Sequence, residues 1–254
     1  MSAAAKLAQL ALLCLPSYET VLGAAMLLLL AAAAAALYSV VGAIRHRAAV
    51  RAAAAEFGPA WNKLPLDLIW VVGSSGAGKS TLSERVAEAV GSKYVDLDDL
   101  YWLPGWQKRS GAEVRALLPP IFAQGPVVIA GSYDSDLATV MRNEASIVVW
   151  VRPALSVLLW QLVSRSLVRI LLRRKTCGGN QESFYTNFFA PNSILRKTYK
   201  SYNRVELRYG ALAANPPKRL DERVIQLRTR AQCDAFRQVL AARTAGTRGV
   251  AVAV

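Results

Sequence analysis

The sequence predicts an α/β fold, in which a five-stranded parallel sheet is flanked by helices and preceded by a hydrophobic helix at the amino terminus. Short apolar runs alternate with segments of helical periodicity, which is typical of a parallel sheet covered on both faces. One apolar run leads directly into a glycine-rich loop. The chain has 254 residues, of which 54% are apolar, and this length suits one well-buried domain better than two large ones.

The five expected strands are short and apolar, and they lie at residues 66–72, 94–96, 127–130, 147–151 and 224–227. Helical spacing predicts helices at 81–90, 114–122, 137–141, 154–175, 193–209 and 231–240. A pair of prolines, Pro119-Pro120, is expected to break the second of these helices. The chain then divides into a hydrophobic helix with its linker at 1–65, an α/β domain at 66–243 and a flexible tail without a pattern at 244–254.

The amino-terminal segment is long and apolar enough to cross a membrane. Residues 20–44 carry no charge, and at about 1.5 Å per residue they span a hydrocarbon core of ~30 Å. Arg45, Arg47 and Arg51 follow, whereas only Lys6 precedes, so the positive-inside rule places the rest of the chain in the cytoplasm. A cleaved signal peptide would carry its basic residues on the other side. We expect a cytoplasmic domain anchored to the inner face of the cell membrane; a soluble helix or a misplaced start codon is the alternative.

Charge and cysteine content narrow the classes of function. The formal net charge is +14, which favours anionic partners such as nucleotides, phosphorylated metabolites, nucleic acid or an acidic membrane surface. Cys14, Cys177 and Cys233 are too few and too scattered for a disulfide framework or a zinc site. His46 is the single histidine, so catalysis by a pair of histidines is excluded.

A phosphate-binding loop follows the first expected strand. Its nine residues fit the pattern G-x-x-x-x-G-K-[ST], and they are Gly73, Ser74, Ser75, Gly76, Ala77, Gly78, Lys79, Ser80 and Thr81. The glycines let successive backbone N–H groups face phosphate oxygens, and the helix that follows adds the positive end of its dipole. Lys79 is expected to reach the β- and γ-phosphates of ATP, and the hydroxyl of Ser80 to ligate Mg²⁺. A P-loop NTPase fold with ATP and Mg²⁺ as cofactors follows; a degenerate loop that binds without turnover is the alternative.

Acidic and aromatic residues follow the second expected strand. Asp96 and Asp98 lie at its carboxyl end, where open α/β sheets bind ligands. One carboxylate is expected to hold Mg²⁺, and the other to accept a proton from a substrate hydroxyl. A polar exit from the strand, without chemistry, is the simpler alternative. Trp102 and Trp106 come next, and their rings either stack on a planar substrate or cover the core.

Four arginines recur on the expected helix at 154–175. Arg165, Arg169, Arg173 and Arg174 come at four-residue steps or next to one, so they share one helical face. Their mutual repulsion is relieved if the helix closes as a lid over a phosphorylated ligand, where it would stabilise transferring charge. The stretch from Arg165 to Arg208 holds ten Lys or Arg against two Glu. A solvated, membrane-facing or DNA-binding basic stripe is the alternative to a lid.

Together these motifs resemble the topology-modulation-protein-like branch of the nucleoside monophosphate kinase and shikimate kinase superfamily. The resemblance covers residues 66–240. It rests on the phosphate loop, the string from Asp98 to Trp106, Gly131-Ser132-Tyr133 after the third strand, and the arginine-rich helix with Glu182 beyond it. It implies a five-stranded parallel sheet, use of ATP and Mg²⁺, and a lid that carries arginines.

One departure from that family bears on the metal site. Where the family has an Asp-Gly-Asn-Tyr string, this chain has Ala130-Gly131-Ser132-Tyr133, so the aspartate that assists Mg²⁺ from the third strand is missing. Either Asp96 takes over that role or catalysis is weakened. The sequence thus predicts an ATP-dependent small-molecule kinase in which Asp98, Trp102, Trp106 and Tyr133 face the acceptor. The alternative is a non-catalytic nucleotide-binding regulator that contacts DNA or an anionic membrane.

Overall fold

The computed structural model describes residues 18–133, 136–220 and 223–251 of the chain. The protein divides into two compact units, one ending at Ala49 and the other beginning at Val50. Lys6 and Cys14 lie outside the described ranges.

The first unit is formed by the apolar part of helix α2 (Tyr18–Trp61). Large apolar side chains between Met26 and Ile44, such as those of Leu29 and Leu37, are exposed. Within the described ranges, α2 is the one helix that is long and apolar enough to cross a membrane. An anchor and a signal sequence share this length and composition, so the membrane anchor stays a prediction.

The last turns of α2 belong to the core of the second unit. Val50, Ala53 and Trp61 are buried there, and the ring of Trp61 stacks on Phe57 and meets Phe236 edge to face, with centroids 5.3 and 5.2 Å away. A helix and then a linker were expected over residues 45–65, and the helical part continues through Pro59 to Trp61. A proline so near the end of a helix removes only one backbone bond, which the buried aromatic contacts outweigh.

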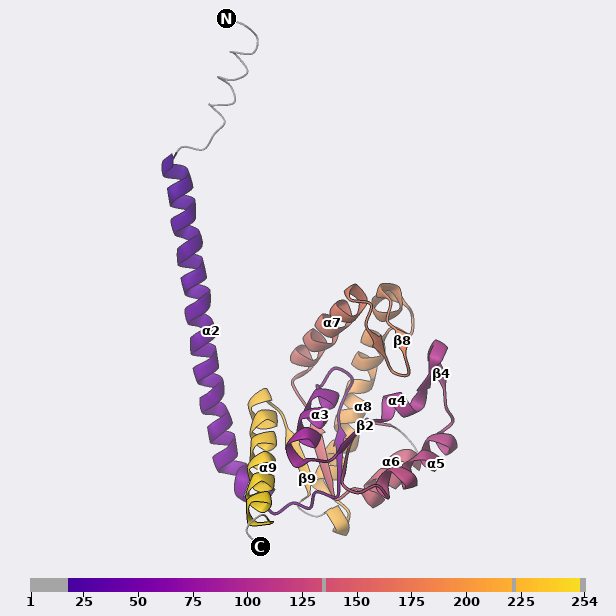
Figure 1. The fold of residues 1–254 in the computed structure, drawn as a ribbon. Coiled ribbons are helices and arrows are strands. Elements are labelled where there is room, and N and C mark those ends of the chain that lie inside the picture. Colours follow the sequence, from indigo (N-terminus) through magenta and orange to yellow (C-terminus); the bar gives the residue numbers. More distant parts are fainter. Residues whose placement is uncertain (1–17, 134–135, 221–222, 252–254) are drawn as a thin grey trace, which may run out of the picture. The chain divides into compact units, whose positions relative to one another are not determined.

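The centre of the second unit is the five-stranded parallel sheet that the sequence predicts (Figure 1). Its strands are β1 (Leu68–Val72), β2 (Lys93–Asp96), β5 (Val127–Ala130), β6 (Ile147–Val151) and β9 (Val224–Leu227). They are ordered β2-β5-β1-β6-β9, and every neighbouring pair is parallel. All residues of β1, β5 and β6 are buried, as expected for apolar strands covered on both faces.

Two separate apolar clusters cover the two faces of this sheet. On one face, alternate strand residues such as Ile69 and Val149 pack with α3 (Lys79–Val90), α9 (Arg230–Ala251) and the end of α2. On the other face, Trp70 and Trp150 pack with α5 (Gly111–Phe122), α6 (Asp136–Glu144) and α8 (Ile194–Ala214). The α/β fold with helices on both faces is confirmed.

Two helices differ from the expected ones. Pro119 and Pro120 do not break α5, which begins with a capping box between Ser110 and Glu113 and runs unbroken to Phe122. Both prolines lie in its last turn, where few intrahelical bonds remain to be lost. Helix α9 continues to Ala251, so most of the tail that showed no pattern is helical.

Two small hairpins, helix α4 (Leu97–Tyr101) and three further short helices were not expected. The first hairpin pairs β3 (Trp102–Leu103) with β4 (Gln107–Lys108), and the second pairs β7 (Lys175–Thr176) with β8 (Asn180–Gln181). Figure 1 shows α4 (Leu97–Tyr101), β4 and β8 at the same end of the domain as the end of α7 (Leu155–Leu171). The short helices are η1 (Pro104–Trp106), the π-helix η2 (Tyr185–Phe189) and η3 (Lys218–Leu220).

Candidate active site

The phosphate loop connects β1 to α3 and takes the curled conformation that its motif requires. Gly73, Gly76 and Gly78 have φ angles of 142°, 86° and 90°. A Cβ on Gly73 would lie 2.3 Å from the carbonyl oxygen of Val151, so no larger residue fits there. All nine residues of the loop line one cleft of about 2010 Å³. The loop is thus open to a ligand of nucleotide size.

Lys79, the first residue of α3, lies folded over the loop. Its Nζ donates to the carbonyl oxygen of Ser74 at 3.1 Å. Burial lowers the pKa of Lys79, and the carboxylates of Asp98 and Asp96 partly offset this effect, while Arg165 adds to it. These four charged groups therefore share one electrostatic environment, although they come from three different parts of the chain. In a bound nucleotide, phosphate oxygens would replace the Ser74 carbonyl oxygen as the acceptors of hydrogen bonds from Lys79 Nζ.

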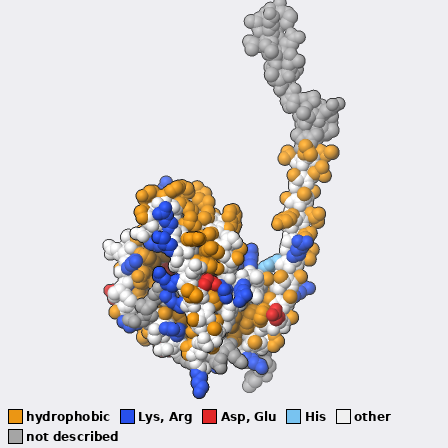
Figure 2. Space-filling model, turned by 180° about the vertical axis from the view of Figure 1, so that it is seen from behind, with side chains coloured by type: hydrophobic (Ala, Val, Ile, Leu, Met, Phe, Trp, Pro, Cys, Tyr) orange, Lys and Arg blue, Asp and Glu red, His pale blue; other side chains and the backbone are white. Residues whose placement is uncertain are grey.

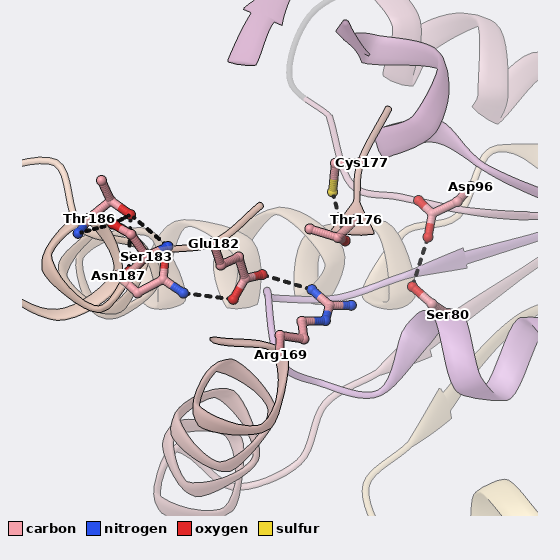
Figure 3. A network of polar contacts seen from close by, with 9 residues as sticks. All are labelled: Ser80, Asp96, Arg169, Thr176, Cys177, Glu182, Ser183, Thr186 and Asn187. Atoms are coloured by element: carbon pink, nitrogen blue, oxygen red, sulfur yellow. Dashed lines mark hydrogen bonds and ion pairs between the residues drawn. The ribbon is translucent and has the colours of Figure 1, made fainter. Parts of the chain in front are cut away.

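Asp96 lies beside the phosphate loop, at the carboxyl end of β2. Its Oδ2 accepts from the hydroxyl of Ser80 at 2.8 Å (Figure 3). The same oxygen accepts from the hydroxyl of Tyr94 at 2.9 Å, and Oδ1 accepts from the backbone N–H of Asp98 at 3.0 Å. The last contact makes Asp96 the N-cap of α4. Burial raises the pKa of Tyr94, and the nearby charge of Asp96 raises it further, so this phenol stays a neutral donor. A serine hydroxyl next to a carboxylate is a donor set that suits Mg²⁺ together with phosphate oxygens and water.

Ala130, where the family has an acid, is the strand neighbour of Asp96. The two residues are paired in register between β2 and β5, and Ala130 is fully buried. The carboxylate of Asp96 therefore lies on the strand next to position 130, where the family that the sequence resembles has an aspartate. Sequence reasoning left open whether Asp96 takes over, and the contact between Ser80 and Asp96 favours that possibility.

Ser132 fastens the phosphate loop to the strand end that carries Ala130. Its Oγ accepts from the backbone N–H of Gly73 at 2.8 Å and donates to the carbonyl oxygen of the same glycine at 3.0 Å. The indole of Trp70 donates to the carbonyl oxygen of Gly131 at 2.9 Å. These bonds fix the start of the loop against the end of β5. The sequence placed Ser132 in a family string but gave it no role.

Asp98 and Tyr133 form a hydrogen-bonded pair in the same cleft. The hydroxyl of Tyr133 donates a short hydrogen bond to Asp98 Oδ1. Burial raises the pKa of Tyr133, and the charge of Asp98 raises it further, so the Tyr133 hydroxyl remains a hydrogen-bond donor. Both residues line the cleft. The structure therefore brings these two candidate acceptor-binding residues together.

Aromatic rings continue from Tyr133 along the same wall. The ring centroid of Tyr101 is 4.8 Å from that of Tyr133 and 5.4 Å from that of Trp102, and Trp102 lies 5.5 Å from Trp106. Tyr101 and Tyr133 also pack against the core, whereas Trp102 and Trp106 belong to neither core cluster. Trp106 is 43% exposed. The tryptophans therefore line the cleft and lie outside the described core clusters, while their stacking on a planar substrate stays a prediction.

A buried asparagine joins the two hairpins. Asn180 donates from Nδ2 to the carbonyl oxygens of Leu103 and Cys177, at 2.9 and 2.6 Å, and its Oδ1 accepts from the backbone N–H of Trp106 at 2.9 Å. Gly178 also packs tightly against the first hairpin, because a Cβ at this position would lie 2.3 Å from the carbonyl oxygen of Trp102. The β3–β4 wall of the cleft is thus held by the segment after α7. Sequence reasoning missed Asn180, because its partners in that wall lie 74 to 77 residues away.

Arg165 and Arg169 extend from α7 into the cleft. Arg169 forms an ion pair with Glu182 at 2.9 Å, and Glu182 also accepts from Asn187 Nδ2 at 2.6 Å (Figure 3). Arg165 is more buried, and its Nε has no hydrogen-bond partner within the described part of the chain. Burial lowers the pKa of Arg165, and the neighbouring Arg169 adds to this effect. A buried guanidinium nitrogen without a partner in a cleft points to an anionic ligand.

Arg173 and Arg174 do not share that face, and the expected helix to Lys175 is wrong. Helix α7 ends at Leu171, and Arg173 takes a left-handed conformation with φ of 48° before the second hairpin begins. Gln181 in that hairpin donates to the carbonyl oxygen of Arg173 at 3.4 Å. Neither arginine lines the cleft, which leaves Arg165 and Arg169 as the arginines of α7 that do.

Further basic residues reach the cleft from α8 and α9. Lys197, Arg204 and Arg208 lie on one face of α8, and Arg230 and Arg237 lie on α9. In total twelve Lys or Arg and five Asp or Glu line the cleft. The excess of positive charge suits a polyphosphate together with an acceptor.

Comparisons with known proteins give a likeness of fold. No protein-family model matches the sequence, and no curated protein matches it significantly. Among solved structures, a gluconokinase from Sinorhizobium meliloti 1021 is 19% identical, with 72% of this chain and 93% of that chain covered and a TM-score of 0.43. A shikimate kinase from Acinetobacter baumannii in complex with shikimate is 16% identical, with 74% and 98% covered and a TM-score of 0.42. A shikimate kinase from Bacteroides thetaiotaomicron is 18% identical, with 69% and 97% covered and a TM-score of 0.37.

Proposed function

We propose that this chain is an ATP-dependent phosphotransferase that moves the γ-phosphoryl group of ATP to a hydroxyl of a small molecule. The observation that carries the proposal is the meeting of four groups in one cleft: Lys79 of the phosphate loop, the Ser80–Asp96 pair, the Asp98–Tyr133 pair and Arg165. A site that only bound nucleotide would have no need of a second carboxylate, that of Asp98, held by Tyr133. The assignment to the topology-modulation-protein-like branch rests on the sequence motifs.

ATP would lie with its β- and γ-phosphates in the loop, held by backbone N–H groups and Lys79. Ser80 and Asp96 would hold Mg²⁺, which neutralises charge on those phosphates when it is bound. Trp102 and Trp106 would bound the acceptor on one side. Asp98 then faces the acceptor hydroxyl, with its carboxylate oriented by Tyr133.

In the transfer step the acceptor oxygen forms a bond to the γ-phosphorus, and the bond from that phosphorus to the β,γ-bridging oxygen breaks. The hydroxyl proton passes to the carboxylate of Asp98, and the bridging electron pair leaves with ADP. Arg165 and Arg169 stabilise the charge on the equatorial phosphoryl oxygens. Their position on the wall of the cleft favours this role over a DNA-binding stripe.

Phosphotransfer in the presence of ATP and Mg²⁺ tests the proposal, with a panel of nucleoside monophosphates and small polyols as acceptors. ADP formation should rise with the right acceptor, and Asp98→Asn should remove most of that rise, because the general base contributes ~10²- to 10⁴-fold. Asp67→Asn, at an exposed residue outside the cleft, is the matched control. If no acceptor raises ADP formation and Asp98→Asn leaves nucleotide binding and any ATPase rate unchanged, the chain is a nucleotide-binding regulator and the proposal fails.

A further inference from the structure

A helix on a water-facing surface normally exposes its charged face and buries its apolar face. Helix α7 exposes an apolar face and turns its charged residues toward the cleft. Its two charged residues, Arg165 and Arg169, line the cleft beside the buried Leu158 and Leu162. The opposite side carries Trp160, Leu167, Val168 and Leu171, which are all exposed and do not line the cleft. These positions fall on one helical face by their three- and four-residue spacing. We call them the outer face of α7.

This outer face is apolar to an unusual degree. Trp160 is 72% exposed and Leu171 is 78% exposed, and the neighbouring Leu172 is exposed as well. No charged residue interrupts the face between Trp160 and Leu171. Scattered exposed apolar residues are normal, but a continuous group of this kind marks a surface that is covered in use.

The apolar surface continues beyond α7 and is bordered by positive charge. Phe184, Tyr185 and Phe189 are exposed in and next to η2, and Tyr199 is exposed on α8, which contacts both η2 and α7. The exposed basic residues of this region that do not line the cleft are Arg173, Arg174, Arg196 and Lys200. Figure 2 shows hydrophobic side chains gathered at one end of the domain with Lys and Arg side chains beside them.

This combination matches the chemistry of an anionic bilayer surface. Apolar and aromatic side chains enter the boundary between headgroups and acyl chains, and a border of Lys and Arg contacts anionic headgroups. A DNA duplex would leave the apolar face uncovered, and an acidic protein would need a matching apolar surface of its own. The chain also supplies a reason for a bilayer to be near, because only five residues separate Ile44, the end of the apolar stretch of α2, from Val50 in the core.

We propose that the outer face of α7, with the aromatic residues around η2, docks on an anionic membrane surface. The arginines that line the cleft lie on the opposite side of the same helix. The helix that contacts the bilayer would therefore be the same helix that carries Arg165 and Arg169 into the cleft. This surface is separate from the phosphate loop, so the proposal does not depend on the chain being a kinase.

Spin labels on the full-length chain test the docking. The background replaces Cys14, Cys177 and Cys233 by serine and is used only if its melting temperature matches that of the unmodified chain. Single cysteines are then introduced by Leu171→Cys and Trp160→Cys, with Ala116→Cys on an exposed part of α5 as the control. Each label is measured in vesicles of phosphatidylcholine alone and of phosphatidylcholine with phosphatidylglycerol. A label that is accessible to oxygen but not to a water-soluble nickel chelate lies in lipid. A label that is accessible to the nickel chelate lies in water.

In vesicles that contain phosphatidylglycerol, labels at 171 and 160 should lose most of their accessibility to nickel and keep that to oxygen, while the label at 116 stays accessible to nickel. Loss of the anionic lipid should weaken the difference. The proposal is overturned if the label at 171 is as accessible to nickel as the label at 116. It is also overturned if that label is shielded from both reagents and shows dipolar coupling between copies, which would assign the face to a second copy of the chain. If α2 does not insert, the same labels report docking of the chain from solution.

Discussion

The hydroxyl of Ser80 donates to Asp96 Oδ2 at 2.8 Å, and this bond joins the phosphate loop to the end of β2. The same carboxylate caps α4 through the backbone N–H of Asp98. The side chain of Asp96 thus orients the hydroxyl of Ser80 and caps the helix that carries Asp98. Together with Ser80, it forms a donor set that suits Mg²⁺. Ala130, next to it in the sheet, contributes no oxygen from its side chain.

Asp96→Asn is expected to raise the Mg²⁺ concentration needed for half-maximal activity, because it removes the carboxylate that accepts from Ser80. Asparagine is as good an N-cap as aspartate, so the melting temperature should change little. Ala130→Asp should alter the Mg²⁺ requirement less. A Mg²⁺ titration of the three chains decides the matter, and a normal requirement in Asp96→Asn would show that Ser80 and the phosphates suffice.

Lys79→Ala is expected to abolish ATP binding or weaken it strongly, because no other cation belongs to the phosphate loop. Calorimetry with ATP and Mg²⁺ measures the affinity. Lys93→Ala serves as the control, since Lys93 is exposed and bonds to Gln124, away from the loop. Equal affinities for ATP in both variants would remove the loop from the nucleotide site.

Arg165→Ala and Arg169→Ala should each lower kcat by ~10²-fold or more and leave ATP affinity nearly unchanged, because their contacts strengthen in the transition state. Arg173→Ala is the matched control: it lies four residues further on, outside the cleft, and should retain normal turnover. Arg169→Ala also leaves Glu182 without its ion pair, so its melting temperature has to be measured alongside. Normal rates combined with weaker and less salt-dependent DNA binding would favour the regulator instead.

Asn180→Ala should raise the KM for the acceptor more than the KM for ATP. The change removes the two hydrogen bonds that hold the hairpin of Trp102 and Trp106, together with the bond to Cys177, and it leaves part-buried backbone groups unpaired. Each such group costs about 1–3 kcal/mol, so the free energy of unfolding should fall too. Asn143→Ala, at an exposed residue of α6, is the control. A rise in both KM values by the same factor would mean that Asn180 serves stability alone.

Local patterns in the sequence were enough for the sheet and the phosphate loop. The loop needs only residues that are neighbours in the chain, and β1 needs only its own apolar run. Asp96 and Asp98 were expected at the edge of the sheet, where the structure has them, because strand ends of a parallel sheet meet at one edge. The pairing of Asp96 with Ser80 follows from that rule, while the full set of donors around Asp96 required the three-dimensional structure.

The remaining features depend on contacts that are distant in the chain. Asn180 gives no local signal, since its partners in the first hairpin are far away in sequence. Arg173 fits the four-residue period of α7, but the turn into the second hairpin ends the helix two residues before it. Apolar residues of α7 suggest burial on every side, and only the structure separates the buried Leu158 from the exposed Trp160.

The burial of Trp61 fixes how far the chain can be shortened. A truncated protein that begins at Leu66, where the first strand is expected, lacks Val50, Ala53, Trp61 and Leu64, and so leaves a hollow beside Phe236. Large-to-small changes in a core cost about 2–5 kcal/mol each, and the loss of several side chains at once would favour aggregation during purification. A truncated protein that begins at Ala49 keeps these contacts and omits the apolar stretch, which makes it the better choice for crystallisation.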